Sequence, residues 1–405
     1  MLRDIRPILS ALLRGRAGVM LVALQIAVTL AVIVNATYIA KQRIDKVRAP
    51  TGMDIDHIFI VSSAGFTKRF NYDATVKEDL AYLRSLSGVV AATITSTVPL
   101  SGFGAGLYLS TKSGGGGRGL LADYIETDEQ GLAALGVRLS AGRFFARDEV
   151  VHPNSLDESV NTFPPALVVS REWAQRVFPD GQVIGQVVYG STSPTRIVGV
   201  LEHMSGAFAN SDKVALGSRR TRPVDGTSYF YIVRTLPGQT DRLLRMVEQH
   251  LTLSNPNRVI DWVRPLGYFK RRSDAADAAL AIFLACVTAV MLAVAALGVY
   301  GLASYHVSTR TKQIGTRRAL GARRRDIVLY FMVENALINS AGILLGCLLA
   351  LGIGQWLSVR NHLPRLDLYY LLGGVLALWT IGQLAVWYPG RRAARVPPAV
   401  ATRTI

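Results

Sequence analysis

The chain has 405 residues, half of them hydrophobic, and a formal net charge of +17 at pH 7. Three short segments, 1–17, 306–327 and 390–405, together hold 15 basic and two acidic residues, whereas 41–275 holds 28 basic and 23 acidic residues. Because the excess charge sits in short segments, with no basic patch interleaved with aromatic residues, the composition argues against a nucleic-acid-binding protein.

Four segments are almost free of charge: residues 18–40, 278–305, 328–357 and 368–389. Each is long enough to cross a hydrocarbon core of about 30 Å at about 1.5 Å per residue, so we expect a membrane protein with four transmembrane helices. Arginine and lysine in short loops beside such helices mark the cytoplasmic side. We therefore expect both termini and 306–327 in the cytoplasm, and 41–275 outside it.

The first helix is predicted over 18–48, which is about 46 Å long and exceeds the bilayer. The second is predicted over 268–305 and begins with charged residues. We expect their outer parts to form a stalk. An alternative interpretation of 18–36 is a cleaved signal peptide, which would still leave 41–275 outside.

Between these helices the pattern predicts an α+β periplasmic domain over 49–267. Two strand-helix-strand units lie at its ends: 57–63, 74–86 and 89–98, then 229–234, 240–251 and 258–263. The strands are rich in β-branched and aromatic residues, and the helices are amphipathic. We expect the two units to form one stalk-proximal lobe, 49–99 with 223–267, and residues 100–222 to form a second lobe inserted into the first.

The inserted lobe alternates short strands and helices. Strands are predicted over 121–126, 166–170 and 196–201, and helices over 128–135 and 171–178. The glycines Gly114–Gly117 resemble a phosphate-binding loop only superficially, because no Lys-Ser/Thr follows them. We expect an exposed hairpin tip there.

Few residues form a pattern typical of a catalytic or metal-binding site. The six histidines have no metal-binding spacing, and no nucleophile is placed with a histidine and a carboxylate, so we expect no catalytic residue, no metal site and no cofactor bound by this chain. The two cysteines, Cys286 and Cys347, lie in apolar segments, so we expect them to pack rather than to form disulfides.

The last two helices are predicted over 328–357 and 368–389, joined by a short periplasmic loop at 358–367. Gly342 and Gly346 have the small-xxx-small spacing that permits close helix contact. Glu334 is an acid inside an apolar segment, and we expect it to pair with arginine or backbone donors at the membrane face.

The segment 306–327 contains the ordered motif Ile-Gly-Thr-Arg-Arg-Ala-Leu-Gly-Ala-Arg. It predicts a short helix along the membrane surface that ends at Gly321, with Ile314, Ala319 and Leu320 on its apolar side. By composition alone, the segment would be an ordinary basic loop beside anionic lipid.

This motif resembles the signature loop of the MacB/FtsX family of ABC transporter permeases. Further stretches at 132–145, 168–185, 196–200 and 389–397 are similar to MacB-type permeases in order and spacing. The resemblance implies contact with an ATPase at this loop. The residues it assigns to that contact are Arg310, Lys312, Gln313, Ile314, Gly315, Thr316, Arg317, Arg318, Ala319, Leu320, Gly321 and Ala322.

The resemblance implies a permease subunit in the bacterial inner membrane. A separate ABC ATPase chain, which would hold ATP and Mg²⁺, would drive movement of the periplasmic domain. The partners it implies are that ATPase, a second permease copy or a paralogue, a periplasmic adaptor and an outer-membrane channel. We expect efflux of a small molecule or peptide.

Two positions depart from the family. Gln313 stands where relatives usually carry Glu, and Thr316 where they usually carry an aliphatic residue. These two differences would weaken the contact with the ATPase. That would suit a heterodimer in which a sister permease contacts the ATPase more firmly. A lipoprotein-releasing permease and a membrane sensor or cell-envelope regulator remain alternative functions.

Overall fold

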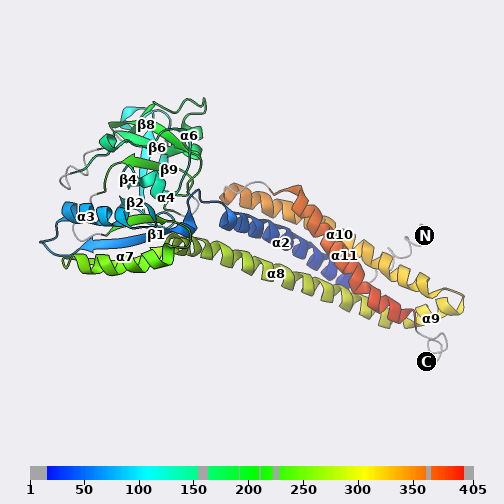
Figure 1. Cartoon of the computed structure of the whole chain (residues 1–405). Coiled ribbons are helices and arrows are strands. Elements are labelled where there is room, and N and C mark those ends of the chain that lie inside the picture. Colours follow the sequence, from blue (N-terminus) through cyan, green and yellow to red (C-terminus); the bar gives the residue numbers. More distant parts are fainter. Residues whose placement is uncertain are drawn as a thin grey trace. The chain divides into compact units, whose positions relative to one another are not determined.

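The computed structural model describes residues 16–153, 163–190, 192–208, 211–221, 228–361 and 366–395. The chain divides into an α+β domain, Arg48–Ala276, and a helical unit formed by Met1–Val47 with Asp277–Ile405 (Figure 1). Most of the two expected cytoplasmic tails, and part of the predicted loop at 358–367, lie outside the described residues.

The α+β domain contains a four-stranded antiparallel sheet made from both strand-helix-strand units. These are β1 (Ile58–Gly65), α3 (Tyr72–Ser85) and β2 (Val89–Thr95), then β10 (Tyr229–Thr235), α7 (Thr240–Ser254) and β11 (Arg258–Pro265). The order β11-β1-β10-β2 alternates strands of the two units, and Ile60 pairs with Ile232. This is the topology of a ferredoxin-like split βαβ fold. The prediction of one lobe built from two distant segments is confirmed.

Both faces of this sheet are buried. Phe59 and Tyr231 pack against Leu80 of α3 and Val247 of α7. On the opposite face, Ile60 belongs to a core shared with the second lobe. Burying each large side chain of this kind stabilises the fold by about 2 kcal/mol.

The residues between β2 and β10 form a second sheet, in the order β5-β8-β6-β9-β4-β3-β7. Its strands are β3 (Ala105–Ser110), β4 (Gly119–Thr127), β5 (Leu139–Gly142), β6 (Ala166–Ser170), β7 (Val187–Gly190), β8 (Ser193–Leu201) and β9 (Val214–Ser218). Because β7 pairs with both β3 and β8, six of these strands close into a ring, with β5 as an additional strand on β8. Closure leaves few unpaired edges.

The described residues of this lobe also form the short α-helices α4 (Gly131–Leu135) and α6 (Arg171–Val177). The helix predicted over 128–135 begins only at Gly131. Asp128 lies before it, because its Oδ1 accepts hydrogen bonds from the Thr93 hydroxyl and from the Gln130 N–H. The expected hairpin tip is confirmed, since β3 and β4 are antiparallel neighbours joined through the exposed Gly114–Gly117.

The helical unit contains α2 (Arg16–Arg48), most of α8 (Leu266–Thr309), α9 (Thr311–Ala319), α10 (Arg324–Asn361) and α11 (Leu368–Ala393). Four of the described helices, α2, α8, α10 and α11, are long and apolar enough to cross a membrane. With the α+β domain, they confirm the predicted class of membrane protein.

Helix α2 packs closely against α10. A Cβ atom added at Gly346 would lie 2.9 Å from Leu30 Cβ, and one at Gly342 would lie 2.7 Å from the Ala23 carbonyl oxygen. The Asn35 amide donates to the carbonyl of Ala350 of α10 at 3.2 Å. The two glycines therefore form a contact within one chain.

Helix α2 also contacts α8. The Gln25 amide donates to the Val294 carbonyl at 2.8 Å, and Arg43 pairs with Asp277 at 2.7 Å. The first contact satisfies a polar group in an apolar setting, where an unpaired one would be costly.

Several helix ends differ from the prediction, and two of them lie beside arginines. Helix α10 begins at Arg324 rather than at 328, and α11 continues to Ala393 rather than ending at Pro389. Pro389 is buried inside α11. A proline inside a helix removes one backbone hydrogen bond, and membrane helices tolerate this loss when neighbouring groups compensate. The continuation places Arg391 and Arg392 in the last turn of α11.

Candidate coupling site between α8 and α10

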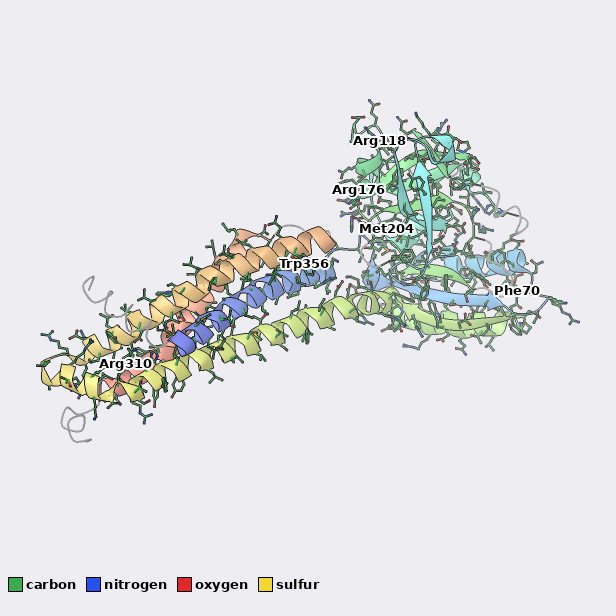
Figure 2. The ribbon with its side chains drawn as sticks, turned by 180° about the vertical axis from the view of Figure 1, so that it is seen from behind. Phe70, Arg118, Arg176, Met204, Arg310 and Trp356 are labelled. Carbon is green, nitrogen blue, oxygen red and sulfur yellow. The ribbon has the colours of Figure 1, made fainter. Side chains whose placement is uncertain are left out.

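The candidate site is α9 with the turns on either side of it. Helix α8 ends at Thr309, Arg310 precedes α9, and α10 begins at Arg324. Figure 2 labels Arg310 at this end of the helical unit and Trp356 at the other end. The short helix predicted within 306–327 is therefore confirmed as α9, which lies between the ends of two long helices.

Helix α9 ends in a Schellman motif. Gly321 has φ +98°, its N–H donates to the Arg318 carbonyl at 3.1 Å, and the Ala322 N–H donates to the Arg317 carbonyl at 3.0 Å. A residue with a side chain would be strained at this φ, so the glycine of the Leu-Gly-Ala sequence determines where the helix stops. The Asp326 carboxylate then accepts from the Arg323 N–H at 2.9 Å at the start of α10.

The buried side of α9 is narrower than the sequence predicted. Ile314 and Gly315 are buried, and Ile314 belongs to the core of the helical unit. Ala319 is exposed and Leu320 is 83% exposed, so the prediction that both share the apolar side with Ile314 was wrong. At about 100° per residue, they lie roughly 140° and 240° around the helix axis from Ile314.

Glu334 of α10 holds the start of α9 in place. Its side chain is 3% exposed, and its Oε2 accepts from Arg310 Nη1 at 3.0 Å. His306 Nδ1 lies 3.3 Å from the other oxygen, Oε1, which accepts no hydrogen bond from any residue that the structure describes. Arg310 also lies 3.4 Å from the Tyr330 hydroxyl. A charge-assisted hydrogen bond in an apolar setting is strong, so this pair fixes α9 against α10.

The sequence did not indicate the roles of Tyr330 and His306. The Arg317 guanidinium lies 4.9 Å from the centre of the Tyr330 ring, in a cation–π contact. Tyr330 precedes Glu334 by one helical turn, and this i, i+4 spacing is a signal that could have identified it.

The remaining predicted residues form the outer surface of α9. The exposed residues are Lys312, Gln313, Thr316, Arg317, Ala319, Leu320 and Gly321, while Arg318 and Ala322 are half-buried. An exposed leucine among cationic residues, on a helix fixed by Ile314 and Arg310, suits docking into an acidic surface with an apolar pocket. Gly342 and Gly346 lie elsewhere, against α2.

Two protein families match the chain. Residues 18–248 match the MacB-like periplasmic core domain, and residues 285–398 match the FtsX-like permease C-terminal domain. Together these matches cover most of both structural units.

The chain is similar to proteins named macrolide export ATP-binding/permease protein MacB. The one from Campylobacter jejuni is 30% identical over 290 residues, which cover 65% of this chain and 41% of that protein. The one from Shewanella oneidensis is 24% identical over 349 residues, which cover 81% and 48%. The chain thus spans less than half the length of these relatives. The crystal structure of the periplasmic region of MacB from Actinobacillus actinomycetemcomitans aligns with a TM-score of 0.35 at 12% identity, over 57% of this chain and 97% of that structure.

Proposed function

The chain belongs to the family of MacB/FtsX-type ABC transporter permeases, and from this premise we propose that it couples ATP hydrolysis by a separate ATPase chain to movement of its α+β domain. In this proposal α9 and both termini face the cytoplasm, and the α+β domain faces the periplasm, in keeping with the arginines of 306–327 and 390–395. The protein itself is a bacterial inner-membrane protein.

The observation that carries the proposal is the exposed Leu320 on an anchored helix. Leu320 is 83% exposed and has arginines on the same helix, a combination that supports the docking of a partner surface here. Ile314 and the Arg310–Glu334 pair hold α9 to the bundle. Force applied to Leu320 would therefore reach α8 and α10 rather than move a loose loop.

Helix α8 supports the second part of the proposal. It begins at Leu266, directly after β11 ends at Pro265, and continues without interruption to Thr309. A displacement of α9 would thus act on the same helix that follows the last strand of the α+β domain.

For the transported substrate, we propose efflux of a small molecule or peptide, together with a periplasmic adaptor and an outer-membrane channel. The names of the relatives, which describe macrolide export, support an export role. We also propose that a second permease copy or a paralogue completes a dimer.

The test is purification of the chain from its native membranes in mild detergent, with mass spectrometry of the proteins that accompany it. We expect an ATPase with Walker motifs to co-purify, and to be lost from Leu320→Asp and from Arg317→Glu/Arg318→Glu. The matched control is Arg242→Glu/Arg245→Glu, which makes the same charge change on exposed positions of α7. No ATPase with the unaltered chain, or equal loss in the control, would refute the coupling site. A co-purified adaptor supports efflux, and a lipoprotein in its place would favour lipoprotein release.

A further inference from the structure

A cavity of about 360 Å³ lies between the first turns of α10 and the last turns of α11. Four arginines line it: Arg324 and Arg325 from α10, and Arg391 and Arg395 from α11 and the residues that follow. Among the described residues, no carboxylate lines the cavity. Its mouth is therefore strongly cationic.

The deeper part of the cavity is apolar. Val328, Leu329 and Met332 line it from α10, and Trp387 lines it from α11. They lie one to two helical turns further into these two helices than the arginines, a depth of roughly 6–12 Å at about 1.5 Å per residue. Both helices are long and apolar enough to cross a membrane. The cavity thus changes from cationic to apolar in the direction of the bilayer interior.

Carboxylates of the described residues do not neutralise these arginines. Within the described part of the chain, none of the four forms an ion pair with a carboxylate, and the nearby Asp326 accepts from the Arg323 backbone instead. Arg391 stacks on Trp387, with its guanidinium carbon 3.7 Å from the ring centre. Cationic groups gathered in this way repel one another unless an anion lies between them.

We propose that this cavity binds an anionic phospholipid, with the phosphate among the arginines and an acyl chain along Val328, Leu329 and Met332. Guanidinium groups bind phosphate through paired hydrogen bonds, and basic pockets between membrane helices are suited to anionic headgroups. A soluble phosphate would leave the apolar half uncovered, and an acidic protein segment would have to enter among lipid-facing side chains. The cavity does not include α9, so the proposal does not depend on contact with an ATPase.

The test uses the full chain, purified in mild detergent and analysed by native mass spectrometry after incubation with phosphatidylglycerol or phosphatidylcholine. We expect phosphatidylglycerol to be retained in preference, and Arg391→Gln/Arg395→Gln to reduce the retained fraction about tenfold. The matched control Arg317→Gln/Arg318→Gln removes the same charge from α9 and should retain the lipid. A large excess of glycerol phosphate should not displace it.

Equal retention of both lipids, or equal loss in the variant and the control, would overturn the proposal. Displacement by glycerol phosphate would do so too, because it would indicate a site for soluble phosphate. If Arg391→Gln/Arg395→Gln does not fold, Arg324→Gln/Arg325→Gln removes two exposed charges from the opposite wall and should give the same loss. Retention unchanged in that second variant would refute the site.

Discussion

The Glu334 carboxylate accepts a hydrogen bond from the Arg310 guanidinium at 3.0 Å, although 24 positions and the whole of α9 separate them in the chain. The acid lies in α10 and the arginine lies between α8 and α9. This pair explains how a short basic helix is held to the bundle when it buries little more than Ile314 and Gly315.

We predict that Arg310→Met destabilises the helical unit by about 3 kcal/mol, because it leaves the buried Glu334 carboxylate without its partner. The double variant Arg310→Met/Glu334→Leu should be closer to the unaltered protein than the single variant is. Thermal unfolding of the purified chain in mild detergent measures both effects. If the effects of Arg310→Met and Glu334→Leu simply add, the two side chains are not coupled and the prediction is wrong.

The glycines of α10 provide a matched pair of substitutions. Gly342→Ala should destabilise the protein by about 1–3 kcal/mol, since the new Cβ would lie 2.7 Å from the Ala23 carbonyl oxygen and 2.9 Å from Ile26 Cβ. Gly352→Ala, on the same helix, has no heavy atom within 4 Å of its new Cβ and should leave stability unchanged or slightly raised. Unfolding midpoints in a series of denaturing detergent mixtures would compare the two. Equal effects would contradict the close α2–α10 contact.

Asp79 joins three elements of the α+β domain. The Tyr231 hydroxyl donates to Asp79 Oδ2 at 2.6 Å, and Arg258 Nη2 donates to Oδ1 at 3.1 Å. Burial raises the pKa of Tyr231 well above its usual value, so the hydroxyl keeps its proton and remains a donor. We predict that Asp79→Asn lowers stability by about 3 kcal/mol, because Arg258 is then left buried without a counter-ion.

Thermal unfolding of the same chain, followed by circular dichroism, tests the prediction for Asp79. The control is Asp241→Asn, which removes an exposed carboxylate from the first turn of α7. Similar unfolding temperatures for the two variants would mean that Asp79 does not have the expected role.

The fourth prediction concerns acid stability. Arg143 donates two hydrogen bonds to Glu149, at 2.7 and 2.6 Å, and this partner lowers the Glu149 pKa from its usual 4.5 to about 2. Because the pKa falls on folding, the ionised carboxylate stabilises the folded state above about pH 4.5. That contribution is lost as the pH falls from there towards 2. The pair is partly exposed, so the effect is small.

The unfolding temperature of the unaltered chain should therefore exceed that of Glu149→Gln by a constant amount at neutral pH. The difference should shrink steadily as the pH is lowered below about 4.5. A difference in unfolding temperature that grows as the pH falls would show that ionised Glu149 destabilises the folded state, contrary to the prediction.

Much of the architecture could be predicted from the sequence because its signals are local. The long uncharged segments predicted α2, α8, α10 and α11, and the strands β1, β2, β10 and β11 have clear β-branched and aromatic character. The pairing of β1 with β10 could be inferred because the same strand-helix-strand pattern occurs twice.

The rest depends on contacts between distant parts of the chain. Strands β3, β5, β7 and β9 were not predicted, because they are short and are stabilised by pairing with other strands of the second sheet. The predicted position of Leu320 on the buried side of α9 was wrong, because the motif predicts a helix but does not indicate which side of it packs against the bundle. The spacing of Gly342 and Gly346 indicates close contact, and only the structure identifies α2 as the neighbour.

The contact between α2 and α10 also has a consequence for how the protein is made. Asn35 of α2 donates to the carbonyl of Ala350, a residue that follows it by 315 positions. During synthesis, α2 must therefore remain in the bilayer without this contact until the whole α+β domain, α8 and most of α10 have left the ribosome. Assembly of the helical unit is therefore completed late, and a chain that stops before Ala350 would carry a first helix that lacks this hydrogen bond to α10.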